Sequence, residues 1–210
     1  MEENKIPLEI AEICNYLSGH RIKLSSQFSD GRINAAINED EILNELELRF
    51  NFIRPRARAW YDMAIECGRR FYPINIKVTD TTHADNLNCK LGIYYALTGI
   101  KPAFPNEIDW LSFFEKLRND FGTDRHQDYY FLIINKQNPA DIFCTTLKGL
   151  QILQPNGNNL PFQCKWNVNR QLINRSFSEA SQFILQTFGE SIKLRSSIYF
   201  NFKRLFPEYV

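Results

Sequence analysis

The chain has no long hydrophobic run, little net charge and no paired cysteine motif. No stretch of about 18 apolar residues occurs, so we expect no transmembrane helix. The first residues, MEENKIPLEI, lack the basic start and the apolar stretch of a signal peptide, so we expect no secretory leader. The net charge is only +1, so composition by itself does not indicate a nucleic-acid ligand.

The cysteines also form no recognisable motif. The cysteines are scattered, their number is odd and no C-x-x-C pair occurs among Cys14, Cys67, Cys89, Cys144 and Cys164. This pattern predicts a reduced, cytoplasmic protein and argues against a structural zinc site. Most free cysteines behave as small buried hydrophobic residues, so we assign none of them a nucleophilic role.

What is present suits a folded domain. The chain has 210 residues, of which 44% are hydrophobic and 23% are charged, so it can bury a sizeable core. Its charge is unevenly distributed: residues 37–47 hold five acids and no base, whereas 54–70 and 165–204 are rich in lysine and arginine. A basic surface around an acidic centre suits a protein that grips a polyanion and binds a metal, although ordinary solvated surface is the alternative.

Hydrophobic spacing and turn residues outline the expected elements. The predicted helices run from Pro7 to Gly19, over 39–50, from Asp85 to Thr98, from Asn106 to Phe121 and from Ser176 onward with a break at Gly189. The predicted strands cover 50–53, 59–66, 71–79, 128–136 and parts of 141–166, with a hairpin turn at Gly68. This order predicts an α/β or α+β domain in which helices flank a central mixed sheet.

Two polar residues interrupt the apolar stretches on either side of Gly68. Asp62 lies in AWYDMAIE and Lys77 lies in YPINIKVT. Because side chains alternate along a strand, Asn75 and Lys77 share one face, and in a hairpin that face can meet Asp62. A carboxylate, a second oxygen donor and a lysine are therefore expected to converge at one edge of the sheet.

This combination of side chains suits hydrolysis of a phosphodiester. Magnesium prefers hard oxygen ligands and keeps some of its waters. The ion neutralises the charge that develops on the scissile phosphate and helps to generate hydroxide. A nearby ammonium group can orient the attacking water, help it to lose a proton or stabilise the transition state.

The pattern Asp-x12-Asn-x-Lys, formed by Asp62, Asn75 and Lys77, resembles the signature Asp-xn-(Asp/Glu)-x-Lys of the PD-(D/E)XK nuclease superfamily. Its spacing is similar to that of type II restriction endonucleases. The run that follows, TDTT, is similar to the polar stretch that often comes after that lysine. The resemblance implies Mg2+ as cofactor, catalysis by the three residues, and DNA contacts by Thr79 and Thr81.

The segment 31–50 resembles the first helix of the same family, which often places a glutamate near the metal. Glu39 is our choice for that role, with Glu45 second. The family's core order of helix, three strands, helix and strand matches about half of the chain. The resemblance thus implies one nuclease domain over 1–210, with its catalytic core at about 39–136 and DNA-recognition and helical additions at about 137–210.

One position departs from the family pattern, because the second acid is Asn75 here. An amide oxygen can bind magnesium but brings no charge, so we expect lower metal affinity. Three explanations are open: Asn75 is natural and sufficient, another acid such as Glu66 or Asp85 takes its place, or the position was altered to stop cleavage. Ordinary structural roles are also open, with Asp62 paired to a nearby arginine and Lys77 protecting an edge strand.

The segment 154–175, QPNGNNLPFQCKWNVNRQLINR, is rich in amide and basic side chains. Asparagine and glutamine can read adenine in the major groove, arginine and lysine can read guanine, and all of them can bind phosphate. The candidate DNA-contacting residues here are Asn158, Asn159, Gln163, Lys165 and Arg170. The alternative is a polar connecting loop, since asparagine and glycine favour turns.

The leading hypothesis is a sequence-specific double-stranded DNA endonuclease of a restriction system, with a cognate DNA methyltransferase as its functional partner. Two strands must be cut, and a two-fold protein matches a palindromic site, so we expect a homodimer. The helices at the two termini are the candidate dimer surfaces. The competing hypotheses are a non-catalytic DNA-binding protein on a decayed nuclease core, and a repair or RNA-processing nuclease with the same core.

Overall fold

A central four-stranded sheet organises the computed structural model, which describes residues 5–20, 31–56, 59–106 and 109–210, with the backbone alone at 31–36. The strand order is β1-β2-β4-β5. These strands are β1 (Met63–Cys67), β2 (Arg70–Thr79), β4 (Tyr130–Asn135) and β5 (Ile142–Thr146). The central pair β2 and β4 is parallel and the outer pairs are antiparallel, so the predicted mixed sheet is confirmed.

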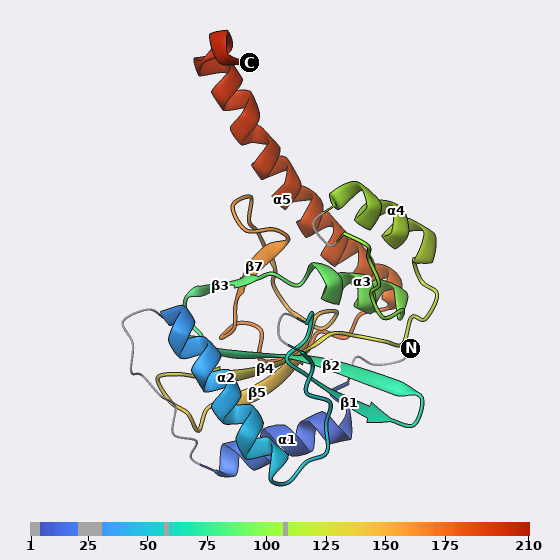
Figure 1. Ribbon diagram of the computed structural model, residues 1–210, viewed down its shortest axis with the longest axis vertical. Coiled ribbons are helices and arrows are strands. Elements are labelled where there is room, and N and C mark those ends of the chain that lie inside the picture. Colours follow the sequence, from blue (N-terminus) through green and yellow to red (C-terminus); the bar gives the residue numbers. More distant parts are fainter. Residues whose placement is uncertain (1–4, 21–30, 57–58, 107–108) are drawn as a thin grey trace.

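Helices cover both faces of this sheet, which confirms the predicted α/β (α+β) class (Figure 1). One face carries α1 (Leu8–Gly19) and α2 (Gly31–Glu47). The other face carries α3 (Lys90–Thr98), α4 (Trp110–Asp120), α5 (Phe177–Leu205) and a small antiparallel sheet of order β3-β7-β6. Its strands are β3 (Ala84–Leu87), β7 (Phe162–Lys165) and β6 (Gln154–Pro155).

Alternating side chains of the main sheet separate two hydrophobic cores. Ile74 and Ile76 of β2 pack toward α1 and α2, whereas Phe131 of β4 packs toward α3, α5 and the small sheet. Because successive residues of a strand point to opposite faces, Asn75 and Lys77 point toward the second of these cores. The two polar residues predicted to share a face therefore do so, at the boundary between the two sheets.

The β1–β2 hairpin turns at Gly68 as predicted, with a φ of 61° that favours glycine. β1 pairs with β2 only over Arg70–Ile74. β2 itself continues to Thr79 alongside β4. The outer edge of β2 beyond Ile74 is therefore left open by β1, and this is where the candidate site lies.

The predicted helix beginning at Asp85 is wrong at its start. Ala84–Leu87 form β3, which pairs with β7, and α3 begins only at Lys90. Asp85 accepts a hydrogen bond from the Trp166 indole at 2.9 Å instead of capping a helix. The strand depends on a partner far away in sequence, which the local pattern could not reveal. The helix end at Gly99 is confirmed, with a φ of 70°.

Other predicted boundaries also needed correction. Asp109, and not Asn106, caps α4 by accepting from the Leu111 backbone N–H at 3.0 Å. The expected strand at 50–53 contributes only an isolated bridge to Ala64. α5 begins after the predicted cap, Ser176, but is not broken at Gly189. A single glycine costs a helix only about 1 kcal/mol, which the packing of its neighbours offsets.

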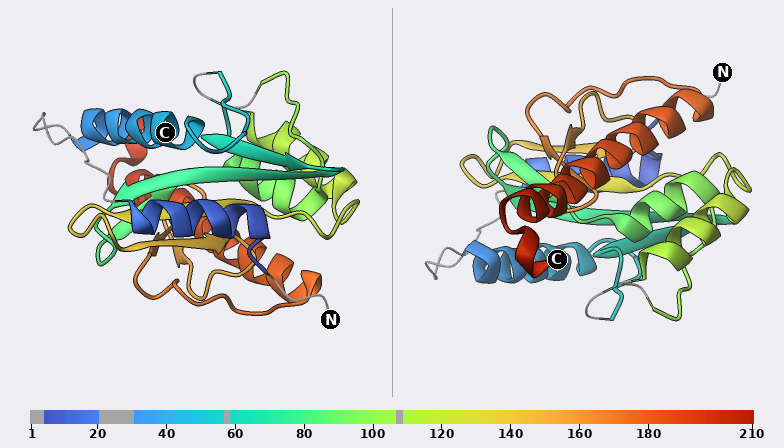
Figure 2. Two further views of the ribbon diagram at one scale, coloured as in Figure 1. Left: turned by 90° about the horizontal axis from the view of Figure 1, so that it is seen from below. Right: turned by 90° about the horizontal axis from the view of Figure 1, so that it is seen from above.

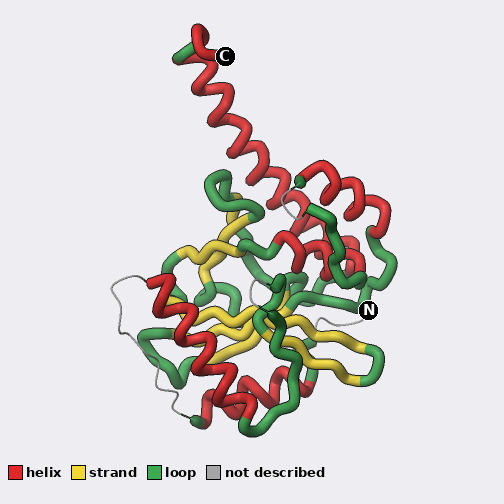
Figure 3. The backbone as a smooth tube through the Cα atoms, in the orientation of Figure 1, coloured by secondary structure: helices red, strands yellow, loops and turns green. Residues whose placement is uncertain are grey.

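α5 passes beside α4 and then extends away from the body, where it ends in η1 (Pro207–Tyr209) (Figures 2 and 3). It has 29 residues. Neither α5 nor any other helix in the described part of the chain combines the length and the apolar character needed to cross a membrane.

Candidate active site

Asp62 lies at the edge of β2 that β1 leaves open. It precedes β1, and its backbone N–H donates to the Ile74 carbonyl at 2.9 Å. Its carboxylate Oδ2 accepts from the Ile76 backbone N–H at 2.6 Å, which satisfies a donor that a further strand would otherwise pair. Burial raises the pKa of this carboxyl, while the Ile76 hydrogen bond and the positive charge of Lys77 act in the opposite direction.

Asn75 lies directly against this carboxylate. Its Nδ2 donates to Asp62 Oδ2 at 2.7 Å, and its side chain also meets the phenol of Tyr129. Both hydrogen bonds to Asp62 reach the same oxygen, so among the described residues Oδ1 accepts none. A half-turn of the amide would exchange its nitrogen and oxygen and offer the oxygen to an ion held by Asp62.

Glu39 of α2 is the third oxygen donor in this neighbourhood. Burial raises its pKa to about 7, and the negative charge of Asp62 adds to the shift, whereas Lys77 and Arg54 oppose it. Electrostatic coupling of this kind requires the groups to be near one another. Glu39, on a helix that packs against the sheet, therefore lies within electrostatic reach of Asp62 and Lys77.

The other acids considered from the sequence have partners elsewhere. Glu45, the second choice on α2, accepts from the Tyr16 hydroxyl at 2.8 Å. Glu66 is exposed and forms an ion pair with Lys101 at 3.1 Å. Asp85 accepts the indole hydrogen bond described above. None of the three takes the position beside the aspartate that the asparagine occupies.

Lys77 is half-buried on the same face of β2 as the asparagine. Burial raises the pKa of the Asp62 and Glu39 carboxyls, and the positive charge of Lys77 opposes both rises. The same charge acts on two buried thiols. Burial raises the pKa of Cys89 to about 12 and also raises the pKa of Cys164, and Lys77 opposes both rises. The positive charge of Lys77 therefore acts on the two carboxyls and on thiols of β7 and of the residue before α3.

This donor set fits a magnesium ion that keeps part of its water shell. Asp62, Glu39 and Asn75 offer hard oxygen atoms. A divalent cation would relieve the repulsion that helps to raise the pKa of Glu39. The described residues contain no group of three or more His, Cys, Asp or Glu suited to a metal. The amide and water would thus complete the coordination, and we expect weak binding.

We expect magnesium affinity to depend on the titration of Glu39. Its pKa of about 7 lies above the ordinary value, so at lower pH the ion must displace a proton. Affinity should therefore rise about tenfold per pH unit until the pH reaches that pKa, and then level off. Isothermal titration calorimetry on DNA-free protein, in buffers of different ionisation enthalpy, measures both the affinity and the released proton.

The same raised pKa affects the stability of the metal-free protein. The stability contributed by protonated Glu39 is fully present below the ordinary carboxyl pKa and is lost as the pH rises through about 7. Glu39→Gln should remove both pH dependences. Glu45→Gln is the matched control, because it keeps an acceptor for Tyr16 and should leave both dependences in place. A pH-independent affinity in the parent chain would contradict this role of Glu39.

The two threonines predicted to contact DNA differ in accessibility. Thr79 ends β2, and its hydroxyl donates to the Asp80 carbonyl at 3.4 Å. Thr81 is only 4% exposed, and its carbonyl accepts from the Asn167 backbone N–H at 2.9 Å. The predicted DNA contact of Thr81 would therefore require this buried side chain to become exposed. The Thr81 backbone carbonyl links the loop after β2 to the loop after β7. The polar residues around Thr81 in the sequence did not indicate this role.

The segment 154–175 forms β6, β7 and the loops around them. Asn158, Asn159 and Lys165 are exposed, so their predicted contacts with DNA are sterically open. Gln163 is half-buried, and its Oε1 accepts from Asn156 Nδ2 at 3.1 Å. Asn156 Oδ1 in turn accepts the backbone N–H groups of Asn158 and Asn159, both at 3.0 Å. Asn156 thus shapes the loop that presents the candidates.

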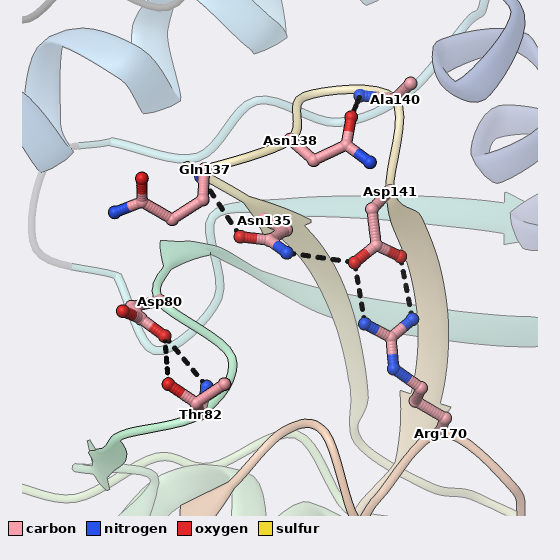
Figure 4. A network of polar contacts seen from close by, with 8 residues as sticks. All are labelled: Asp80, Thr82, Asn135, Gln137, Asn138, Ala140, Asp141 and Arg170. Carbon is pink, nitrogen blue, oxygen red and sulfur yellow. Dashed lines mark hydrogen bonds and ion pairs between the residues drawn. The ribbon is translucent and has the colours of Figure 1, made fainter.

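Arg170 has a partner within the chain (Figure 4). Its Nη1 and Nη2 donate to the two carboxylate oxygens of Asp141 at 2.7 and 2.6 Å, and Asn135 Nδ2 adds a bond to the same carboxylate at 3.0 Å. The guanidinium also lies 4.5 Å from the ring centroid of Phe143. Such a bidentate pair is strong for its type and lowers the pKa of Asp141. A DNA phosphate would compete with this carboxylate for the guanidinium or share it.

We expect this ion pair to serve the fold more than DNA binding. Arg170→Ala and Asp141→Ala should each lower the free energy of unfolding by about 1 kcal/mol, and each should change DNA affinity only slightly, Arg170→Ala downward and Asp141→Ala upward, as the loss of one charge requires. Urea unfolding and fluorescence anisotropy with duplex DNA measure the two effects. Asp141→Ala releases the guanidinium, so a loss of DNA affinity of about tenfold or more in Arg170→Ala would instead identify Arg170 as a contact residue.

Sequence reasoning missed Tyr129 as part of the site. This buried side chain meets Asn75, and its hydroxyl donates to the Trp60 carbonyl at 2.6 Å, just before Asp62. It lies in the strand predicted from DYYFLIINK, but only the register of β4 against β2 brings it to the site. The pairing of Asn75 with Phe131 sets that register.

No protein-family model matches the chain, and no curated protein matches it either. The functional argument therefore depends on the geometry of the residues. Two acids, an amide and a lysine at the open edge of a sheet form a polar site that can hold a divalent cation and act on a phosphate ester.

Proposed function

We propose that the chain is a magnesium-dependent endonuclease that cuts double-stranded DNA at a specific sequence, in the manner of type II restriction enzymes. One observation carries the proposal: Asp62 and Asn75 are in contact at 2.7 Å, and Lys77 and Glu39 both lie within electrostatic reach of that aspartate. The resemblance of the same residues to the PD-(D/E)XK pattern supports it further.

The residues of the chain would divide the work of hydrolysis. Magnesium, when bound, would neutralise charge on the scissile phosphate and acidify a coordinated water. Asp62, whose carboxylate accepts the Ile76 N–H, would be a ligand of that ion. Glu39, with a pKa of about 7, can accept a proton near neutral pH. Lys77 supplies a positive charge that orients the attacking water and stabilises the negative transition state.

The proposal extends to partners and location. Duplex DNA is the substrate, a homodimer cuts the two strands, and a cognate DNA methyltransferase protects the host's own sites. The cytoplasm is the proposed compartment. All five cysteines are free thiols, which supports a reducing environment.

One observation favours a competing function. The uncharged Asn75 occupies the position of the family's second acid, as expected if a nuclease core had decayed into a non-catalytic DNA-binding protein. The half-buried Lys77 and the raised pKa of Glu39 favour retained chemistry, because burying such groups costs stability and groups with strongly shifted pKa values cluster at functional sites.

Digestion of plasmid DNA with magnesium tests the proposal. We expect discrete fragments with 5′-phosphate and 3′-hydroxyl ends. A continuous smear would favour a repair or RNA-processing nuclease. Specific binding in a gel-shift assay without any cutting would favour the decayed core. Either result would overturn the proposed function.

A further inference from the structure

An open cavity of about 1010 Å³ lies at the end of the main sheet where β2 and β4 begin. This volume is large enough for a small-molecule ligand. The cavity is lined by the first turns of α1 and α5, the starts of β2 and β4, the loop between α4 and β4, and the loop after β5. In Figure 2 the first turns of the two helices lie at the same end of the sheet. We refer to this space as the basic cavity.

The basic cavity is separate from the candidate active site. Tyr72 lines the cavity, whereas Lys77 lies five residues further along β2, or roughly 16 Å away along the strand. Tyr72 also packs with the core beneath α1 and α2, on the opposite face of the sheet from Lys77. None of the candidate catalytic residues lines the cavity.

Positive charge dominates the lining of the basic cavity. Only two carboxylates, those of Glu9 and Asp128, take part in it. The basic side chains around it are those of Lys5, Arg70, Arg125, His126, Lys148 and Arg175. The first turn of α1 adds backbone N–H groups, and its N-cap residue, Pro7, has no side-chain acceptor to satisfy them. The cavity is therefore suited to an anion with several charges.

Lys148 is a buried cation in the wall of this cavity. It is only 4% exposed, and its Nζ donates to the carbonyl of Arg125 at 2.9 Å and to the carbonyl of Gln127. Two of its three hydrogens are thus used. No carboxylate of the described residues lies within 4 Å of the ammonium group, although Asp128 and Asp124 act on it from further away. Burying a charge without a paired ion is costly, and a phosphate in the cavity would supply that ion.

Arg125 and Phe177 also line a second, smaller hollow of about 360 Å³, so the two spaces adjoin. The Arg125 guanidinium lies 5.3 Å from the centroid of the Phe177 ring and has no carboxylate partner in the described part of the chain. Phe121 lines the smaller hollow, is 38% exposed and lies 5.4 Å from Phe177 between ring centroids. Gln182 adds an exposed amide. We refer to this second space as the aromatic hollow.

We propose that the two spaces together bind a free nucleoside polyphosphate, with its phosphates in the basic cavity and its base against Phe121 in the aromatic hollow. Ammonium and guanidinium groups form strong hydrogen bonds to phosphate oxygens. A base of any identity can stack on an aromatic ring, and the amide of Gln182 can bond to a base edge. This inference adds a ligand to the proposed function and does not depend on DNA cleavage.

A free nucleotide fits these features better than duplex DNA does. The bases of a duplex are stacked inside it, and each must be flipped out before it can stack on a protein ring. A duplex would therefore offer the aromatic hollow no base unless it were first distorted. The base of a free nucleotide is already available.

Isothermal titration calorimetry of the full chain with adenosine triphosphate tests the proposal. A chelator keeps the candidate active site free of metal. We expect one nucleotide per chain. Arg125→Ala should raise the dissociation constants of adenosine triphosphate and of inorganic tripolyphosphate about tenfold or more, because a charged donor is lost. Arg125 is exposed, so the fold should persist. Arg204→Ala is the matched control, since this exposed arginine near the end of α5 lines neither space.

Phe121→Ala separates the base from the phosphates. It should weaken adenosine triphosphate about tenfold and leave tripolyphosphate unchanged, because it removes a stacking surface and no charge. Phe206→Ala is its control. That phenylalanine is 46% exposed and also lies beside a second ring, that of Phe202, at 5.2 Å between centroids, but it is remote from both spaces.

Four results would overturn the inference. They are a parent chain that binds no adenosine triphosphate, an Arg125→Ala variant that binds it like the parent, an equal effect of Phe121→Ala on both ligands, and a short DNA duplex that displaces the nucleotide and loses as much affinity on Arg125→Ala. The last would assign the basic cavity to DNA. A parent chain that binds the nucleotide but does not cut DNA would overturn only the proposed function.

Discussion

Lys77→Ala should lower the rate of DNA cleavage by about 10²–10⁴-fold, while leaving specific DNA binding largely intact. Lys77 is the one candidate catalytic residue with a positive charge, and its ammonium group acts on both Asp62 and Glu39. Its removal would take away the group that we propose to orient the attacking water and to stabilise the developing negative charge. The β-strand keeps its register, because that depends on backbone pairing with β1 and β4.

Metal loss would not explain the effect of this substitution. The substitution removes a positive charge that acts on the carboxylates of Asp62 and Glu39. These carboxylates should therefore attract magnesium more strongly. The rate is therefore measured at saturating magnesium, with DNA binding followed by anisotropy. Lys101→Ala is the control, since that lysine is exposed and pairs with Glu66. Cleavage by Lys77→Ala at the parent rate would remove Lys77 from the active centre.

Asn75→Asp should make both stability and cleavage respond more strongly to magnesium. The amide now donates to Asp62 at 2.7 Å, so the variant would bring two carboxylates into contact. Without metal we expect a loss of about 1–3 kcal/mol in the free energy of unfolding at neutral pH. Mutual repulsion raises the pKa of at least one of the two carboxyls. The loss should therefore be small at pH below about 4 and grow as the pH rises through that raised pKa.

Magnesium should reverse this loss, because the ion compensates the added charge and is held more firmly. Cleavage at limiting magnesium should rise, or appear if the parent chain is inactive. Thermal melts and a magnesium titration of cleavage measure the two effects. Asn138→Asp is the matched control, since that exposed side chain only accepts a turn hydrogen bond from the Ala140 N–H at 3.3 Å. A lower rate for Asn75→Asp at every magnesium concentration would show that the side chain does not face the metal.

Short-range features of the site could be predicted from the sequence. Gly68 marks the turn, alternation along the strand puts Asn75 and Lys77 on one face, and the hairpin brings Asp62 to them. These inferences needed only the period of a strand and the geometry of a tight turn. Glu39 came from the family resemblance, because nothing local links α2 to the edge of β2.

Features that depend on distant partners could not be predicted. Asp85 has the composition of a helix cap, but β7 draws its segment into a strand. Arg170 has the side chain of a DNA contact, and nothing local in the sequence indicates its ion pair with Asp141. Thr81 is polar in sequence and buried in the fold. In each case a tertiary neighbour overrides the local preference, and only the three-dimensional structure supplies that neighbour.

The central claim is that Asp62, Asn75, Glu39 and Lys77 form a magnesium-dependent centre that cuts duplex DNA. Cleavage of plasmid DNA by the purified parent chain, side by side with Lys77→Ala purified in the same way, tests it most directly. We predict discrete fragments from the parent with magnesium, none when the metal is chelated, and cleavage by Lys77→Ala that is slower by at least about a hundredfold. Equal cleavage by the two proteins, or no cleavage by the parent at any magnesium concentration, would contradict the claim.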